Sequence, residues 1–453
     1  MKPGPVKPDG GSDPGAEQGK SFRTFLWVWF GQVISATGSG LTRFAIGVHV
    51  YQETGSETLF ALIAVAASLP AILLSPVAGV LVDRWSRRRA MIVADIGSAV
   101  ATLGLVSLFA IGELSLGAIY ALVALSSLFE AVQMPAFTAS TTLLVPKRHF
   151  GRAAGMTQFG HAGARLAAPL LAGALLGPLG LPGVVALDVA SFLIAMAILL
   201  AVRIPDPPRR AAAAALNFSG RWRSVLAEAL EGWRFIRQRG GLLALLGFFA
   251  ALNFVLPLCT LLTTPLVLSF ADEAVLGQVL GFAAAGGIAG SVLMSSWGGP
   301  RRRVLGVLGA GPIMVLGLVI AGAQALPLFV ATGLFLVSFC VPVVNGCSQA
   351  LWQVKTPPAL QGRVFATRRM VAQISGPVAF GLSGLLAERV MNPLLVDGGA
   401  LADTFVGALL GVGSGRGIGL LFVICGVAFL AVTVFSFALR PLRRVDLDLE
   451  DAV

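Results

Sequence analysis

Long apolar segments recur along this chain, and short polar stretches separate them. In the first half they lie near residues 23–50, 59–82, 90–111, 115–141, 153–176 and 183–202. In the second half they lie near residues 242–264, 275–297, 304–323, 326–352, 370–387 and 417–438. A helix of about 20 apolar residues crosses the roughly 30 Å hydrocarbon core of a bilayer. The pattern therefore predicts an all-α membrane protein with 12 transmembrane helices.

Composition favours this class and argues against others. Of the 453 residues, 56% are hydrophobic and 12% are charged, whereas a soluble domain has about 25% charged residues. The cysteines, at positions 259, 340, 347 and 425, all lie in apolar segments without metal-ligand spacing, so we interpret them as packing residues. The 3 histidines cannot supply a metal cluster or a Ser-His-Asp set, and no Walker A motif occurs. We expect no enzyme activity, no metal and no cofactor.

The charges predict an orientation in the membrane. Most Lys and Arg residues lie in the N-terminal tail, in every second loop and in the stretch between the two halves. Such segments stay in the cytoplasm, so we expect both termini there. The opposite loops carry acidic residues instead, namely Glu53, Glu57, Glu113, Asp272 and Glu273. Because the net charge of +11 is spread between apolar segments, we expect lipid rather than nucleic acid as the partner.

These patterns divide the chain into five parts. Residues 1–22 predict a disordered cytoplasmic tail without the apolar core of a signal peptide. Two six-helix bundles are predicted over residues 23–203 and 242–438, with a cytoplasmic tail over 439–453. Between the bundles, residues 204–241 predict a cytoplasmic linker, in which Arg221 to Arg239 has the spacing of an amphipathic helix at the membrane surface.

The two halves are similar to each other in sequence. Gly151-Arg152 recurs as Gly362-Arg363, and Gly173 matches Gly384 at the same spacing. The basic cluster at residues 87–89 recurs at residues 301–303. Such a duplication is typical of transporters whose substrate site lies at mid-membrane between two repeats. We therefore predict two pseudo-symmetric bundles with a central cavity.

The loop after the second segment resembles the signature loop of the major facilitator superfamily. A glycine is followed four residues later by Asp-Arg and then by a basic cluster: Gly79, Asp83, Arg84, Arg87, Arg88 and Arg89. Similarity to its macrolide-efflux and enterobactin-exporter branch rests on Phe30-Gly31-Gln32 with Ser35, Gly38 and Ser39, on residues 135–146, on Asp188 with Ser191-Phe192, and on residues 231–236. The resemblance implies the major facilitator fold and export by proton antiport across a bacterial inner membrane.

Two departures from the family pattern limit what the resemblance implies. Ser86 stands where the signature loop usually has glycine, and the antiporter signature of segment 5 is reduced to Ala168-Pro169 and Gly173. The expected direction of transport therefore rests on the branch. For gating we single out Asp83, Arg84 and Arg87. The Asp83 carboxylate, at the end of a helix, can pair with Arg84 or Arg87 and so hold one face closed. The alternative is that these arginines only fix the orientation.

Polar residues at helical spacing indicate helix faces turned away from lipid. As substrate-cavity residues we predict Gln32, Ser35, Ser39, Arg43, Gln133, Asn253, Asn345 and Gln349. The alternative is hydrogen bonding between helices without substrate contact. Ionisable groups inside the segments are confined to the first half, and the second half has no clear intramembrane charge. We interpret Asp95 and Asp188, each close to a membrane face, as structural.

Glu130 and Arg165 are our candidates for proton coupling. Each lies about a dozen residues, or roughly 18 Å, from the inner end of its segment, so we expect a pair near the midplane. The alternative is a permanent structural ion pair. The leading hypothesis is a monomeric, proton-coupled exporter of a small amphipathic or hydrophobic molecule, such as a natural product, siderophore or drug. Alternatives are a membrane sensor or scaffold that transports nothing, or an importer or lipid transporter of the same fold.

Overall fold

The computed structural model describes residues 22–145, 150–202, 204 and 231–449, and within these ranges it contains helices and no strand. The long helices of the first half are α2 (Phe22–Thr54), α3 (Glu57–Arg84), α4 (Arg87–Ala110), α5 (Leu116–Leu144) and α6 (Phe150–Ala201). Those of the second half are α8 (Gly240–Leu268), α9 (Glu273–Trp297), α10 (Arg303–Ala323), α11 (Pro327–Lys355), α12 (Pro358–Leu385) and α14 (Arg416–Ala438). Every predicted apolar segment falls on one of these helices.

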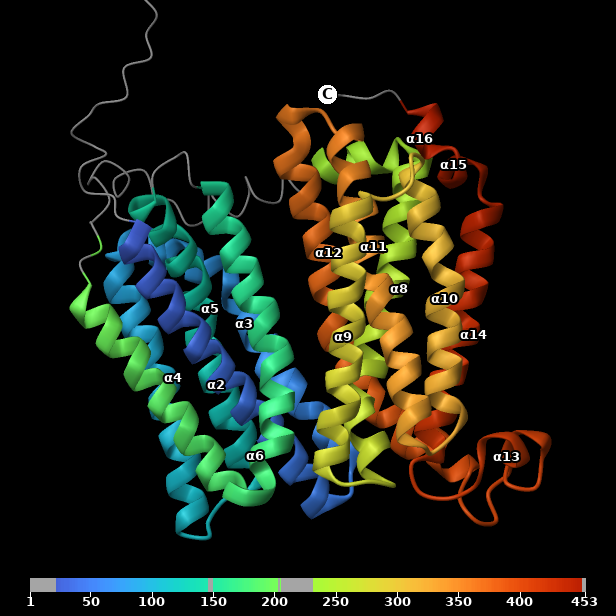
Figure 1. The fold of residues 1–453 in the computed structure, drawn as a ribbon, viewed down its shortest axis with the longest axis horizontal. Coiled ribbons are helices and arrows are strands. Elements are labelled where there is room, and N and C mark those ends of the chain that lie inside the picture. The colour runs from blue at the N-terminus through green and yellow to red at the C-terminus, as the bar shows by residue number, and fades with distance from the viewer. Residues whose placement is uncertain (1–21, 146–149, 203, 205–230, 450–453) are drawn as a thin grey trace, which may run out of the picture.

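Within the described ranges, 9 helices are long and apolar enough to cross a membrane. One of them, α6, contains both the fifth and the sixth predicted segments, over an apolar stretch of 43 residues. Its chain direction reverses at Gly180, whose φ of 63° lies in the left-handed region that glycine adopts without strain. Figure 1 shows the two arms of α6 as a hairpin. The remaining two long helices, α2 and α12, fall outside the nine, and both contribute polar residues to the sites described below.

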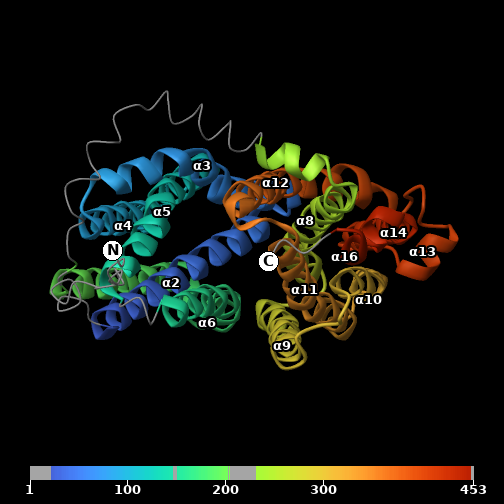
Figure 2. The ribbon, with the colours of Figure 1, turned by 90° about the horizontal axis from the view of Figure 1, so that it is seen from above.

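The helices form two bundles that stand side by side (Figures 1 and 2). Helices α2 to α6 make up the first, with cores around Phe25, Met91 and Phe137 and around Leu41 and Val184. Helices α8 to α14 make up the second, whose larger core includes Phe248, Trp352 and Phe422. The fold is thus the predicted helical membrane protein with two bundles.

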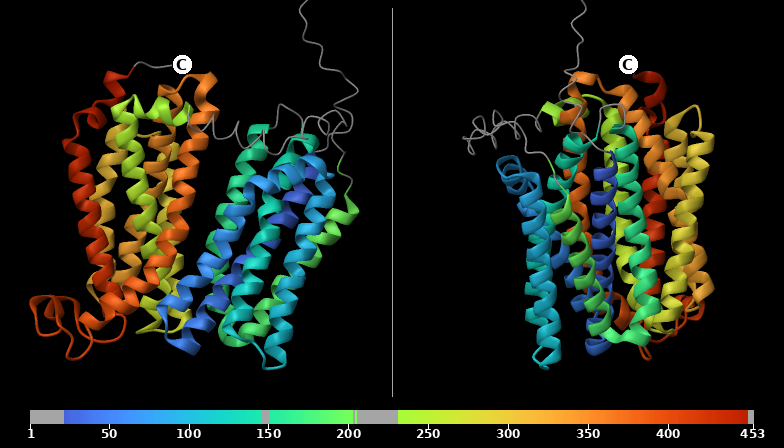
Figure 3. Two further views of the ribbon diagram at one scale, coloured as in Figure 1. Left: turned by 180° about the vertical axis from the view of Figure 1, so that it is seen from behind. Right: turned by 60° about the vertical axis from the view of Figure 1, so that its left-hand side comes forward.

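The bundles meet at one end of the molecule, at the bottom of Figure 1. There α12 packs on α3 and α6 packs on α9. We call this the acidic end, because it carries Glu57, Glu113, Asp272, Glu273 and Glu388. The opposite end, which we call the basic end, carries the described starts of α2 and α4 and the last described residues of the chain (Figure 3).

At the basic end, the start of the predicted C-terminal tail is folded. Helices α15 (Arg440–Arg443) and α16 (Val445–Asp448) pack near the start of α8. Lys355 Nζ donates a hydrogen bond to the carbonyl oxygen of Asp446 at 2.8 Å, and Asp446 Oδ2 accepts one from the amide of Val304 at 2.9 Å. Residues 1–21 of the predicted N-terminal tail and residues 205–230 of the predicted linker lie outside the described residues, so the predicted amphipathic helix is described only from residue 231.

Candidate functional site

A cavity of about 360 Å³ lies within the first bundle, between α2, α4, α5 and α6. Its polar wall consists of Gln32, Ser35, Ser39, Arg43, Asp95, Ser98, Glu130, Gln133, His161 and Arg165. Met134, Phe137 and Phe192 form an apolar part of the same wall. The structure therefore brings together every cavity residue predicted in the first half and both predicted coupling residues. The mixed wall is suited to a molecule with both apolar and polar parts.

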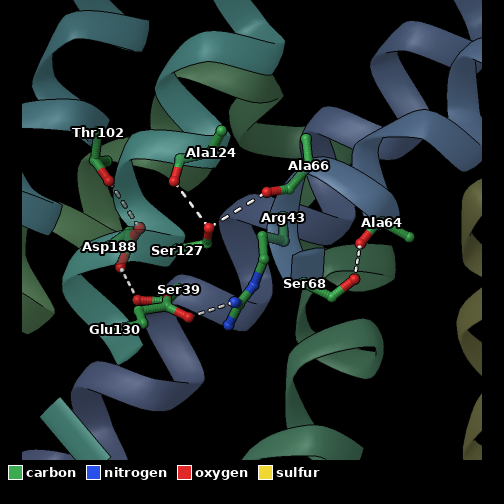
Figure 4. Close-up of polar contacts among 10 residues, drawn as sticks. All are labelled: Ser39, Arg43, Ala64, Ala66, Ser68, Thr102, Ala124, Ser127, Glu130 and Asp188. Atoms are coloured by element: carbon green, nitrogen blue, oxygen red, sulfur yellow. Dashed lines mark hydrogen bonds and ion pairs between the residues drawn. The ribbon is translucent and has the colours of Figure 1, made fainter. Parts of the chain in front are cut away.

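An ion pair lies on this wall. Arg43 Nη1 donates to Glu130 Oε2 at 2.6 Å, and the two side chains are 37% and 30% exposed (Figure 4). We predicted Arg165 as the partner of Glu130; in this structure Glu130 pairs with Arg43 instead, and Arg165 lines the same cavity. Counting residues along a helix gives the depth of a side chain. It does not give the direction in which that side chain points across the bundle.

A second carboxylate, Asp188, lies next to this pair and is buried. Its Oδ1 lies 3.5 Å from Ser39 Oγ on α2, and its Oδ2 accepts from Thr102 Oγ1 on α4 at 3.4 Å (Figure 4). A small cavity of about 20 Å³ is lined by Arg43, Glu130 and Asp188 together. This space is about large enough for one water molecule. Asp188 thus joins three helices and also borders the charged pair.

Asp95 was interpreted as structural, yet it lies on the wall of the main cavity. The residue is 3% exposed, and its Oδ1 accepts a hydrogen bond from Gln133 Nε2 at 3.0 Å. Gln133 Nε2 also donates to Gln32 Oε1 at 2.6 Å. Among the described residues, Asp95 Oδ2 and Gln133 Oε1 have no hydrogen-bond partner. The signal in the sequence was two amides, Gln32 and Gln133, which lie in their segments at a depth similar to that of Asp95.

The predicted cavity residues of the second half lie apart from this cavity. Asn253 is on α8, and Asn345 and Gln349 are on α11, with both α11 side chains exposed. Gln349 Oε1 accepts a hydrogen bond from Arg368 Nη1 on α12 at 3.0 Å, and Ser348 Oγ lies 3.2 Å from Arg368 Nη2. The structure therefore places these residues in the other bundle.

The sequence predicted no clear intramembrane charge in the second half, but Arg368 lies within a helix of that half. Residue 368 falls between the predicted segments 326–352 and 370–387, but α12 begins at Pro358, so Arg368 lies roughly 15 Å into the helix. Its guanidinium lies 5.5 Å from the ring centroid of Phe249 and 5.7 Å from that of Trp352. The signal was Pro357-Pro358, since proline is favoured in the first turn of a helix.

The predicted gating loop is described in part. The side chains of Asp83 and Arg84 lie outside the described part of the structure. Ser86 caps α4, because its Oγ accepts from the amide of Arg89 at 3.3 Å, which gives a role to the residue that replaces the usual glycine. Arg88 donates to the carbonyl oxygens of Leu199 and Leu200 at the end of α6, at 2.8 and 2.7 Å. The gating role of Arg87 stays a prediction.

Comparison with known proteins settles the family. The family model described as Major Facilitator Superfamily matches residues 28–380. The chain belongs to the major facilitator superfamily. It is thus a membrane transporter of the superfamily, in agreement with the signature loop and the two bundles.

Relatives within the superfamily are named for efflux. Macrolide efflux protein A of Streptococcus pyogenes is 28% identical over 385 residues, which cover 81% of this chain and 90% of the relative. The multidrug efflux pump Tap of Mycolicibacterium fortuitum is 27% identical, covering 80% of this chain and 89% of the relative. The enterobactin exporter EntS of Citrobacter koseri is 25% identical, covering 76% and 80%.

Solved structures share the superfamily fold. A bacterial homologue of the human lysosomal transporter Spinster, solved in an inward-facing and unoccupied conformation, superposes with a TM-score of 0.66 at 15% identity. The superposition covers 96% of this chain and 98% of that one. A D-xylose–proton symporter superposes with a TM-score of 0.62 at 13% identity, covering 89% of this chain and 97% of the symporter. At such identities the likeness supports the fold alone.

Proposed function

We propose that this chain exports a small amphipathic or hydrophobic molecule by alternating access, driven by proton entry. The observation that carries the proposal is the Arg43–Glu130 ion pair on the wall of the first-bundle cavity. An ionisable group within a membrane costs at least ~2.5 kcal/mol unless it is paired or hydrated, so such groups are rarely kept without a function. Relatives named for efflux of macrolides, drugs and enterobactin support the direction.

The ion pair offers a simple way to couple a proton to a conformational change. While Glu130 is ionised, it neutralises Arg43 at 2.6 Å. Proton binding to Glu130 removes that neutralisation and frees the guanidinium for another partner or for water. Arg165, on the same wall, is a second cation toward which Glu130 can turn in another conformation. Glu130 and Arg165 thus stay our coupling residues, and Arg43 joins them.

The cavity lining supports the substrate class. Gln32, Ser35, Ser39 and Gln133 supply hydrogen-bonding groups, while Phe137 and its apolar neighbours accept apolar surface. In the second bundle, Asn253, Asn345 and Gln349 complete the proposed substrate contacts. We propose that Asp83, Arg84 and Arg87 gate the basic end, and that the protein works as a monomer.

The proposed location is the inner membrane of a bacterium, with both termini in the cytoplasm. The test uses the full chain with its four cysteines replaced, and a new cysteine at Ser12 or Ser224. An impermeant maleimide added to intact cells is expected to label neither position, and to label both after permeabilisation. Efficient labelling of intact cells would reverse the orientation.

The coupling test compares two transport modes of one variant in proteoliposomes, with radiolabelled erythromycin as the probe. A proton crossing ~100 mV contributes about 2.3 kcal/mol to uphill movement. Glu130→Gln is expected to abolish uphill efflux driven by a proton gradient and to retain exchange without a gradient. The matched control is Glu113→Gln, which changes an exposed carboxylate in the turn after α4 and should leave both modes intact.

Three outcomes count against parts of the proposal. Unchanged uphill efflux by Glu130→Gln would remove Glu130 from coupling. Loss of exchange together with uphill efflux would indicate a structural ion pair. If the unaltered protein moves no probe in either direction, although it is folded and inserted, the sensor or scaffold alternative is favoured for that class of molecule.

A further inference from the structure

Within the described part of the chain, one short segment of the first bundle makes most of the polar contacts with the second. It comprises residues 51–58, that is, the end of α2, the turn at Gly55 and the start of α3. Gly55 has a φ of +62°, which lets the chain reverse direction within two residues. Tyr51 Oη donates to the carbonyl oxygen of Pro265 on α8 at 3.3 Å, and Gln52 Nε2 donates to Glu273 Oε1 at the start of α9.

The strongest of these contacts involve Glu388, which lies just beyond α12 in a π-helical turn (Leu386–Met391). Glu388 Oε2 accepts from Ser56 Oγ at 2.6 Å and from the amide of Thr58 at 2.9 Å. That amide is one of the free donors in the first turn of α3, where a negative charge is favoured. The second bundle therefore supplies a capping carboxylate to a helix of the first.

A second contact lies one turn further along. Asn392 Nδ2 donates to Glu57 Oε1 at 2.9 Å, and Glu57 is only 5% exposed. Glu388 and Asn392 together thus contact three consecutive residues of the first bundle, Ser56, Glu57 and Thr58. We call these five residues the latch.

The side of the latch on the second bundle is held firmly in place. A Cβ added at Gly417 on α14 would lie 2.4 Å from the amide nitrogen of Asn392, so the turn rests directly on α14. Arg416 is 4% exposed and donates to the carbonyl oxygens of Gly322 and Ala323 at the end of α10, at 3.0 and 3.1 Å. Because the turn packs on α14, and Arg416 joins α14 to α10, a displacement of Glu388 is transmitted to the helices of the second bundle.

We propose that the latch holds the acidic end closed, and that Glu388 and Asn392 must release residues 56–58 before the transporter opens on that face. The inference rests on the proposed alternating access, since a protein that never changes shape has no need of a releasable contact. Glu388 is a positioning residue here and touches no substrate. Hydrogen bonds to a charged acceptor are among the stronger ones, so their loss is expected to shift the equilibrium by about tenfold.

The test measures access to the cavity from the acidic end and needs neither substrate nor proton gradient. In the full chain with its four cysteines replaced, Ala36→Cys places a thiol on the wall of the first-bundle cavity. A membrane-impermeant maleimide is added to intact cells. Ser414→Cys, an exposed position at the acidic end, is labelled in parallel to confirm which side that end faces. If Ser414→Cys is labelled only in inside-out vesicles, the whole experiment is done in such vesicles and not in intact cells.

With the latch intact, labelling at position 36 is expected to be slow. Glu388→Gln should raise its rate about tenfold, Asn392→Ala should raise it less, and Glu113→Gln should leave it unchanged. Ser56→Ala changes the other side of the same contact, so its effect should not add to that of Glu388→Gln. Size-exclusion chromatography in detergent confirms that each variant is folded.

Two results would overturn the proposal. One is a labelling rate in folded Glu388→Gln equal to that of the parent. The other is full additivity of Ser56→Ala and Glu388→Gln. If the labelling rates change as described but the protein shows no proton-driven transport, the latch is supported and only the proposal of proton-driven export is contradicted.

Discussion

Gly384 on α12 packs directly against the main chain of Glu57 at the start of α3. A Cβ at residue 384 would lie 2.5 Å from both the carbonyl oxygen of Glu57 and the Cα of Thr58. The matching residue of the first half, Gly173 on α6, makes an equivalent contact, because a Cβ there would lie 2.8 Å from the carbonyl oxygen of Glu273 at the start of α9. Two glycines that the sequence repeat relates thus hold the bundles together at the acidic end.

We therefore predict that Gly384→Ala disfavours closure of the acidic end. A methyl group cannot fit against backbone atoms without moving one bundle away from the other, so labelling of Ala36→Cys from that end should rise about tenfold or more. Gly376→Ala is the matched control on the same helix, since a Cβ there has no neighbour within 4 Å. Equal labelling of the two variants would show that the helices adjust without opening.

The second prediction concerns the pH at the acidic end. Partial burial disfavours the charge on Glu388, but hydrogen bonds from Ser56 and Thr58 and the nearby Arg389 outweigh it and hold the pKa below the ordinary value of 4.5. Glu388 lines a pocket at the acidic end together with other carboxyls, on Glu57, Asp272, Glu273 and Asp397. A lowered pKa means that Glu388 stabilises the closed state above pH 4.5, and that this stabilisation is lost as pH falls through the lowered value.

Pulsed electron paramagnetic resonance can measure this loss directly. Spin labels at Ile111→Cys and Leu409→Cys, both exposed positions at the acidic end, report the distance between the bundles. We expect a longer distance to gain population below about pH 4.5 in the parent, and to be populated at every pH in Glu388→Gln. An identical pH response in the two proteins would assign the change to the other carboxyls of the pocket.

The sequence predicted the features that depend on position along a helix. It did not predict which side chains meet, because that depends on the direction in which each side chain points across the bundle. Apolar length located every long helix, because crossing a bilayer is a one-dimensional requirement. The pairing of Glu130 with Arg43 instead depends on how α2 and α5 are rotated, which no spacing within one segment reveals. Arg368 was missed for a different reason: α12 begins at Pro358, directly after Pro357 and earlier than the apolar run suggests. The latch was not predicted, because Glu388 and Ser56 are far apart in the chain.

The third prediction concerns Arg368 and Gln349. Arg368 Nη1 holds the Gln349 amide at 3.0 Å, so Arg368→Gln should weaken erythromycin binding about as much as Gln349→Ala, by roughly tenfold each. Because the two side chains form one unit, the double variant should bind about as weakly as either single variant. Arg301→Gln, at an exposed position of the basic end, is the control. Scintillation proximity binding with purified protein measures all four, and additive losses would mean that the two residues act separately.

The last prediction concerns Asp95, which is buried against neutral amides. Gln133 Nε2 donates to Asp95 Oδ1, while Asp95 Oδ2 and Gln133 Oε1 lack a hydrogen-bond partner among the described residues. Asp95→Asn keeps the shape and the acceptor, and its new amide group can donate to Gln133 Oε1. Burying a charge without a cation costs more than burying an amide. The variant should therefore be as stable as the parent or more so, by about 1 kcal/mol.

An assay of uphill efflux distinguishes two possible roles of Asp95, proton transfer and a purely structural contact between α4 and α5. If its carboxyl takes part in proton transfer, Asp95→Asn loses uphill efflux while its melting temperature stays equal or rises, since the variant is folded but cannot bind and release a proton there. If Asp95 only holds α4 to α5, efflux follows stability and is unchanged in the variant. Gln133→Leu is the matched control for stability: it removes the hydrogen bond but leaves the carboxyl, so it should lower the melting temperature. A fall in melting temperature for Asp95→Asn greater than that for Gln133→Leu would contradict the premise that the charge is costly in this position, and with it the argument for a proton on Asp95.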